Sequence, residues 1–354
     1  MITVLTSGVA LGVHVPGLLL VRRLAERGVD AQVEVLERLL PPSARTRVLA
    51  SKTAFHRDFR LAVAGHRLRP DPVRRMDERR VAALLDQWAG EGRRRFVVLS
   101  GFWFPLLERY AAEHGVVPDV DALHVDSVPS LSFHGSTSAA ARDVWLLDAE
   151  AGTIPLTIPV GHQPPRPWAD RSRDPRVLAH GGGWGIGTYA ERGRRLAARG
   201  LGVDVVGYEA ADVDAELATT FLLDSAWQPW DDDGFPPFGP VAPDGTVRFS
   251  RGADHHGSFD LARRAVAMVS KPGGGTLLDS LAAATPVVLT EPLGDHEARN
   301  AALWRQLGLG VDFADWWDGG CSLDVLHDLH RNLLAARAGV PSYAARLGEE
   351  VTRC

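Results

Sequence analysis

Cysteine is scarce in this sequence, which has only Cys321 and Cys354 among its 354 residues. Two cysteines exclude a cysteine-bound metal cluster and a framework of disulfides, and so little cysteine is typical of a reducing compartment. The first residues also lack the basic segment and the small-residue cleavage site of a secretory signal. We therefore expect a cytoplasmic protein.

Two further absences narrow the class of protein. No run of about 18 apolar residues occurs, so we expect no transmembrane helix. The chain also has no surplus of positive charge, because 44 acidic and 39 basic side chains give a formal net charge of -5. Such a balance offers no basic stripe for a nucleic-acid backbone. We expect no nucleic-acid partner.

The composition does supply enough apolar material for two cores. Hydrophobic residues make up 45% of the chain, and at roughly 100–200 residues per domain its length predicts two domains. Six prolines between residues 154 and 175 mark the boundary, because proline removes a backbone donor and restricts the residue before it. We predict a first domain over 1–160, a linker over 161–175, a second domain over 176–340 and a final helical segment over 341–354.

Both halves show the alternation of strands and helices that is typical of a parallel sheet. In the first half, residues 1–6 predict a buried strand, 7–17 a glycine-containing loop, 18–27 a helix and 29–35 the next strand. The pattern restarts after the linker with a strand over 176–180. The sequence therefore predicts an α/β protein with two Rossmann-like domains.

The second half contains two more features that a structure can test. A glycine-rich turn over 181–187 leads into a helix, which Thr188 and Glu191 would open as a capping box. Further along, residues 223–256 form a long stretch with no regular pattern. We expect this stretch to be irregular.

The most informative segment is Ser-Lys-Pro-Gly-Gly-Gly-Thr at residues 270–276, between a predicted strand and a predicted helix. Glycines permit close approach of the backbone, and the N-terminus of the helix at Thr276 presents free amides that could hold an anion. Asp279, about one turn further on, could accept two hydrogen bonds from a ribose. Equally, the glycines could make only a tight turn, with Asp279 placed to favour the helix dipole.

The motif continues through residues 281–288 to Gly-Asp-His-Glu-Ala-Arg-Asn-Ala at 294–301. In this order it resembles the donor-site signature of two-domain nucleotide-sugar glycosyltransferases. The closest resemblance is to the group of the peptidoglycan N-acetylglucosaminyltransferase and the diacylglycerol glycosyltransferases, with the macrolide and plant-type enzymes as cousins. It implies the GT-B fold, in which two Rossmann-like domains face a cleft and the last helix, near residues 343–351, crosses back to the first domain.

The resemblance also implies where the donor binds. In that group a glycine-rich loop and the following helix bind the diphosphate, an acid on the helix binds the ribose, and a polar cluster after the next strand binds sugar hydroxyls. A glycine-rich turn early in the second domain faces the donor phosphate. Here these donor-binding roles fall on Gly182, Gly183, Trp184, Lys271, Gly273, Gly274, Gly275, Thr276, Asp279, Asp295, His296, Glu297 and Asn300, with the register over 295–300 left open.

A catalytic histidine is implied in the first loop. Residues 12–17, Gly-Val-His-Val-Pro-Gly, resemble the family's Gly-His-Val-x-Pro-Gly loop, with a spacing one residue shorter. His14 would take the proton of the acceptor hydroxyl as the anomeric carbon is attacked. Asp126, at the end of a predicted strand, is the best-placed carboxylate to orient it. Without the resemblance, His14 reads as a cap of the helix near Pro16, and Asp126 as a turn residue.

Other motifs fit the architecture less well. The acids at 231–233 and 119–121 imitate the metal-binding pair of single-domain glycosyltransferases, but we interpret them as solvated loop acids. Asp-His-His at 254–256 has no second cluster to complete a metal site, and the resemblance implies that it belongs to the loop that lies beside the nucleotide base in the family. Residues 102–107 could line an acceptor pocket or pack in the core. We expect no metal, and no cofactor beyond the nucleotide diphosphate sugar as co-substrate.

Together with these observations, the resemblance implies an inverting, metal-independent glycosyltransferase. It would move a hexose from a nucleotide diphosphate sugar, such as a UDP-sugar, to a hydroxyl of a small-molecule acceptor, a natural product being one candidate. Two alternatives stay open. One is a nucleotide-sugar 2-epimerase, and the other is a catalytically silent protein that binds a nucleotide sugar.

Overall fold

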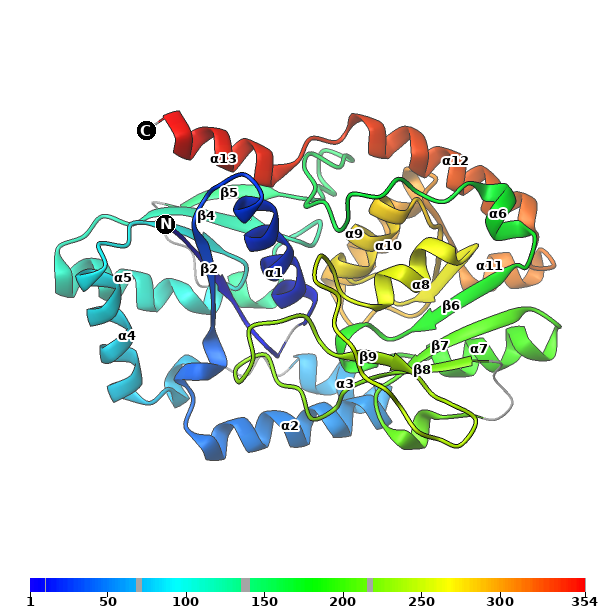
Figure 1. The fold of residues 1–354 in the computed structure, drawn as a ribbon, viewed down its shortest axis with the longest axis horizontal. Coiled ribbons are helices and arrows are strands. Elements are labelled where there is room, and N and C mark those ends of the chain that lie inside the picture. The colour runs from blue at the N-terminus through cyan, green and yellow to red at the C-terminus, as the bar shows by residue number, and fades with distance from the viewer. Residues whose placement is uncertain (10, 68–71, 135–140, 215–218, 354) are drawn as a thin grey trace.

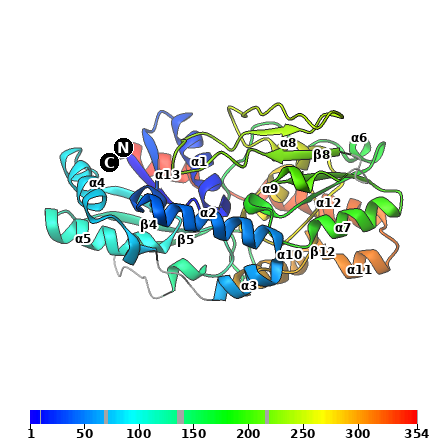
Figure 2. The same cartoon turned by 90° about the horizontal axis from the view of Figure 1, so that it is seen from below.

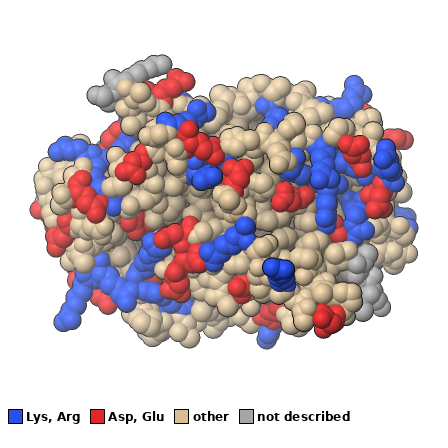
Figure 3. Space-filling view, viewed as in Figure 1, with Lys and Arg blue, Asp and Glu red and all other residues tan. Residues whose placement is uncertain are grey.

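The computed structural model describes residues 1–9, 11–67, 72–134, 141–214 and 219–353. They form two parallel sheets, one in each half of the chain, with helices on both faces (Figure 1). Among the described residues, no helix is both long enough and apolar enough to cross a membrane. On the face shown in Figure 3, acidic and basic side chains are interspersed.

The first sheet has five parallel strands in the order β2-β1-β3-β4-β5. Its strands are β1 (Ile2–Thr6), β2 (Ala31–Val35), β3 (Arg95–Val98), β4 (Asp119–His124) and β5 (Ala141–Trp145). Its helices are α1 (Leu11–Ala25), α2 (Pro42–Arg57), α3 (Phe59–Arg67), α4 (Glu78–Gly90) and α5 (Phe104–His114).

The second sheet has seven strands in the order β12-β11-β10-β6-β7-β8-β9, all parallel except β9, which pairs antiparallel with β8. Its strands are β6 (Arg176–His180), β7 (Gly202–Gly207), β8 (Thr219–Leu223), β9 (Phe238–Pro240), β10 (Ala267–Ser270), β11 (Val287–Leu289) and β12 (Gly310–Asp312). The helices of this half are α6 (Trp168–Ser172), α7 (Tyr189–Ala198), α8 (Ser258–Arg264), α9 (Gly274–Ala283), α10 (Asp295–Gln306), α11 (Phe313–Asp318), α12 (Leu323–Gly339) and α13 (Tyr343–Arg353).

Side chains alternate along each strand, and the central strands of both sheets are buried on both faces. In β6, Leu178 belongs to the core that also contains residues of α1, α8 and α9, whereas Val177 and Ala179 pack with residues of α7 and α11. The expected α/β fold class with two Rossmann-like sheets is confirmed. The carboxyl ends of parallel strands are where ligands enter such sheets.

The last helix lies against the first sheet although its sequence follows the second. In Figure 1, α12 (orange-red) lies over the second half and α13 (red) over β4 and β5. The Tyr343 hydroxyl donates to Asp121 Oδ2 at 2.6 Å, and the Tyr343 amide donates to Thr157 O at 2.9 Å. These contacts tie the end of the chain to the first half.

Three expectations about local structure were wrong. The acids at 119–121, interpreted as solvated loop acids, lie on β4, where Asp121 is buried and accepts from Arg95. The predicted loop over 7–17 ends early, because α1 begins at Leu11 and Pro16 lies inside it. Proline deletes only one amide hydrogen bond of a helix, and the apolar residues that follow bury α1 strongly enough to offset that loss. Thr188 precedes α7, but its hydroxyl donates to Glu291 in place of capping the helix.

Candidate functional site

The two halves of the molecule meet where α1 and the end of β4 face the glycine-rich turns of the second sheet. Glycine is required for this approach, since a Cβ on Gly183 would lie 2.2 Å from Leu11 Cβ. A Cβ on Gly274 would lie 2.8 Å from the carbonyl oxygen of Val125. The sequence-predicted donor residues are thus brought against the first domain.

The N-terminus of α9 holds a carboxylate. The helix begins at Gly274, two residues before the predicted start, and the Gly274 amide donates to Asp126 Oδ1 at 3.1 Å. Asn300 Nδ2 donates to the same oxygen at 2.7 Å, and Asn300 Oδ1 accepts from the Ser127 amide at 2.8 Å. Because free amides and the helix dipole attract anions, Asp126 marks an anion position at this helix end.

His14 lies inside α1 and is turned into the core. It is 1% exposed, and its Nδ1 lies 3.1 Å from Thr6 Oγ1. Among the described residues, Nε2 has no hydrogen-bond partner. Burial, reinforced by the positive charge of Arg38, lowers the pKa of His14 to about 3. The expected Asp126–His14 pair is therefore not formed, since each side chain bonds elsewhere.

The segment over 224–237, part of the stretch expected to be irregular, covers His14. Trp227 is buried, with its ring centroid 6.1 Å from that of His14. Arg38 Nε donates to Trp230 O at 3.3 Å, which ties the segment to the first domain. In Figure 1 this segment (yellow-green) reaches from the second half to the N-terminal end of α1.

The acids at 231–233 are mostly exposed, and each is paired with an arginine. Asp231 lies 3.6 Å from Arg45, Asp232 lies 2.5 Å from Arg251, and Asp233 pairs with Arg38. The structure thus uses these acids as ion-pair partners, two of them to the first domain. Within the described ranges, one cluster of side chains has the spacing of metal ligands, namely Glu26, His162 and Asp254. The Arg23 guanidinium bonds to all three.

The predicted sugar-binding cluster divides into buried and accessible residues. Glu297 is buried, accepts from the Leu293 amide at 2.7 Å and pairs with Lys271. Burial alone would raise the pKa of Glu297, but the charge of Lys271 lowers it below its usual value. Asp295 is exposed and His296 half-buried, so these two side chains are available to a ligand.

A second polar group surrounds the predicted ribose acid. Asp279 Oδ1 lies 3.1 Å from His256 Nε2, whose ring also lies 2.9 Å from Ser258 Oγ through Nδ1. Burial lowers the pKa of His180 to about 4, although the nearby charge of Asp279 opposes this shift. The Gly182 amide donates to His180 Nδ1 at 3.3 Å. Asp279 therefore lies beside two histidines.

The glycine-rich turn of the second domain borders this group. Gly182–Trp184 form a short 3₁₀ helix, and Gly182 has a φ of +69°, a left-handed conformation that favours glycine. Trp184 packs with Leu11 and Trp227. Gly273 precedes α9, Gly275 lies against Gly12, and Thr276 is buried in the first turn.

Sequence reasoning missed His66 altogether. This half-buried residue lies on α3 of the first domain, and its ring centroid is 5.1 Å from that of His296. Burial and the charge of His296 lower the pKa of His66. No local pattern marks His66, because the contact joins residues 230 positions apart. His180, by contrast, is recognisable as the last strand residue before a glycine-rich turn.

Comparisons with known proteins give the fold. No protein-family model matches the sequence, and no curated protein matches it. Among solved structures, the glycosyltransferase SnogD from Streptomyces nogalater is similar with a TM-score of 0.58 at 15% identity, over 99% of this chain and 98% of SnogD.

Two further solved structures agree. The Streptomyces sp. SF2575 glycosyltransferase SsfS6, complexed with thymidine diphosphate, has a TM-score of 0.55 at 15% identity over 100% of both chains. MurG of Acinetobacter baumannii has a TM-score of 0.52 at 10% identity, over 100% of this chain and 99% of MurG. These similarities confirm the expected GT-B fold.

Proposed function

We propose that this protein is an inverting glycosyltransferase that binds a nucleotide diphosphate sugar between its two domains and transfers the sugar to a hydroxyl of a small-molecule acceptor. The observation that carries the proposal is the anion position at the N-terminus of α9, where Asp126 bonds to Gly274. In a GT-B fold this position lies at the carboxyl end of the second sheet, in the cleft.

The donor diphosphate takes the place of the Asp126 carboxylate in this proposal. Backbone amides at 274–276 and the positive end of the α9 dipole then carry the charge that develops on the leaving diphosphate. Lys271, a short distance away and paired with Glu297, adds a cation. This arrangement needs no metal ion. The acids at 231–233, which could otherwise bind one, are each paired with an arginine.

In this proposal, the ribose binds to the polar residues around Asp279, and the sugar binds to those at the start of α10. Asp279, beside His256, accepts the ribose hydroxyls, and Asp295 and His296 bind sugar hydroxyls at the start of α10. SsfS6, which shares this fold, was crystallised with thymidine diphosphate, and this supports a nucleoside diphosphate as the ligand.

The proposed base is His14, and its use requires a change from the arrangement described. With a pKa of about 3, the buried imidazole accepts a proton poorly. Movement of the segment over 224–237 would expose the ring and return its pKa toward 6.5, where an imidazole suits general-base chemistry. Asp126, once displaced by the donor, would be free to orient a histidine.

Release of free nucleoside diphosphate tests the proposed transfer. The protein is incubated with a panel of UDP- and TDP-sugars and hydroxylated small molecules, with and without a chelator. We expect release that depends on both substrates and survives chelation. A change of sugar configuration without release would indicate an epimerase, and binding with neither outcome would indicate a silent binding protein. Loss on chelation with rescue by magnesium would refute the metal-free site.

A further inference from the structure

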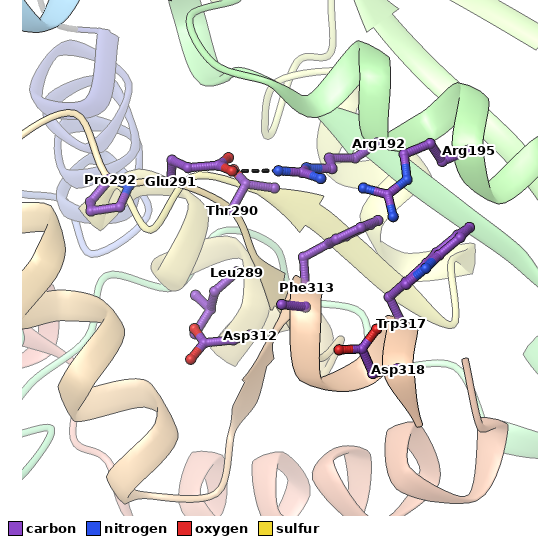
Figure 4. A pocket seen from close by; sticks show the side chains of 11 residues that line it. Arg192, Arg195, Leu289, Thr290, Glu291, Pro292, Asp312, Phe313, Trp317 and Asp318 are labelled. Carbon is purple, nitrogen blue, oxygen red and sulfur yellow. Dashed lines mark hydrogen bonds and ion pairs between the residues drawn. The ribbon is translucent and has the colours of Figure 1, made fainter. Parts of the chain in front are cut away.

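A cavity of about 310 Å³ lies in the second domain, apart from the donor residues described above. It opens between α7, the end of β11 and the start of α11 (Figure 4). Arg192 and Arg195 form one wall, Phe313 and Trp317 another, and Thr290 lies where β11 ends. Its volume is at the lower end of the range of small-molecule sites.

Arg195 presents a guanidinium without an anionic partner. Its central carbon lies 4.3 Å from the ring centroid of Trp317 and 5.4 Å from that of Phe313. Across the described chain, no hydrogen bond or ion pair involves this side chain. Stacking on aromatic rings holds the planar group in place while its N–H edges stay available.

Two more residues that line the cavity each have one buried polar atom without a hydrogen-bond partner among the described residues. Thr290 is 7% exposed, and its Oγ1 has no hydrogen-bond partner within the part of the chain that the structure describes. The same holds for Arg192 Nε, although another nitrogen of Arg192 donates to Glu291 at 2.5 Å. A buried polar atom without a partner costs free energy, so the cavity favours a ligand that bonds to these atoms.

Among the described residues, none of the acids that line the cavity pairs with the Arg195 guanidinium. Glu291 is paired with Arg192 and Thr188, and Asp312 is paired with Arg305 at 2.6 Å. Asp318 lies on the other side of Trp317 from Arg195 in Figure 4. Arg192, Arg195 and Thr290 therefore line a cavity in which no described carboxylate accepts a hydrogen bond from Arg195.

We propose that this cavity is a second binding site, which takes a small oxyanion of the phosphate-ester or carboxylate class. A planar guanidinium binds such groups through two parallel hydrogen bonds, and the Thr290 hydroxyl adds a third donor. The site is separate from the donor position at α9, which uses helix amides. It is therefore independent of the proposed transfer reaction.

Isothermal titration of the full chain with methyl phosphate and, separately, with acetate tests the site. The titrations are done at constant ionic strength with UDP present, so that the anion position at α9 is occupied. We expect one-site binding of at least one probe. The probe that binds with the higher affinity identifies the class of oxyanion. Arg195→Gln should weaken this binding about ten-fold or more, because it removes charge-assisted hydrogen bonds.

Two companion variants make the result decisive. Thr290→Val keeps the shape and the charge, and should weaken binding several-fold even if Arg195→Gln disturbs α7. Arg194→Gln, one residue away on α7 and paired with Asp214 outside the cavity, is the matched control and should bind like the parent. Equal affinity of the parent and both cavity variants, or no binding of either probe up to about 10 mM, would overturn the proposal.

Discussion

Asp279 lies in the second turn of α9, where its carboxylate bonds to His256. We predict that Asp279→Asn weakens nucleoside diphosphate binding about ten-fold or more, since hydrogen bonds to a charged group contribute roughly 1.5–3 kcal/mol. Isothermal titration measures the change. Inorganic diphosphate, which has no ribose, is the control ligand and should bind both proteins alike. Equal nucleotide affinity in the two proteins would exclude the ribose role.

His14 is the proposed base, and His66 is a second first-domain histidine near the predicted donor residues. If His14 is the base, His14→Ala should lower turnover by roughly 10²–10⁴ and leave nucleoside diphosphate affinity nearly unchanged, because the residue lies outside the donor site. His66→Ala is the matched comparison, since His66 faces His296. A normal turnover in His14→Ala with the loss seen in His66→Ala would move the role to His66.

Residues that act through backbone geometry were predictable from the sequence. The glycines at 273–275 indicated a strand-to-helix turn, and the structure places α9 there within two residues of the expected start. The direction of His14 was not predictable, because it depends on where α1 begins. A shift of one residue along a helix rotates a side chain by about 100°. The one sequence signal of the different His14 direction was the spacing between His14 and Pro16, which is one residue shorter than in the family's loop.

The segment over 224–237 is the element that controls the environment of His14. Trp227 covers the imidazole, and burial is the largest cause of its low pKa. We predict that Trp227→Ala raises the pKa of His14 from about 3 toward 6.5, because solvent then stabilises the imidazolium. NMR titration of the His14 ring measures this. An unchanged pKa in the variant would show that Thr6 and the core, not Trp227, set it.

Among the elements, the strands were more predictable than the contacts that join them. Apolar runs identified β1 and β6, which are largely buried on both faces, and the alternation of apolar residues identified β2 at the edge of its sheet. Thr188 and Glu191 matched a capping box in sequence, yet Thr188 bonds to Glu291, about a hundred residues away. Local patterns contain no information on such long-range partners, which form only once the second sheet is assembled.

At the scale of the whole molecule, α2 contacts the second half through several side chains, and His56 is one of them. His56 lies 2.8 Å from Gly185 O and 3.0 Å from the carboxylate of Asp212 (Figure 2 shows α2 extending from the first half toward the second). Burial would lower the pKa of His56, but the hydrogen bond and charge of Asp212 raise it overall. The same pair lowers the pKa of Asp212, against the effect of its burial.

The His56–Asp212 pair predicts a pH-dependent stability. The pKa of His56 is higher in the folded protein than the unfolded value of 6.5. Its contribution to the free energy of unfolding is therefore complete below pH 6.5 and is lost as the pH rises through the pKa of the folded protein. The Asp212 contribution is lost in acid, below 3.8. We expect the melting temperature of His56→Gln to fall below that of the parent at about pH 6, by about 2–4 °C per kcal/mol lost, and the gap to narrow by about pH 9. A constant gap would contradict this.

The architecture followed from the order of motifs, whereas the closeness of the two domains did not. Packing of Leu11 on Gly183 and of Asp126 on Gly274 depends on shape complementarity between surfaces more than a hundred residues apart. The sequence indicated glycines at both positions and an acid at the end of β4. It offered no reason to expect that this acid would occupy the anion position of the other domain.

A crystal structure of the protein with UDP or TDP tests the central claim most directly. We predict that the terminal phosphate lies on the amides at 274–276, that the Asp126 carboxylate has left Gly274, and that Asp279 accepts the ribose hydroxyls. A nucleotide bound elsewhere, with Asp126 still on Gly274, would contradict the proposed donor site.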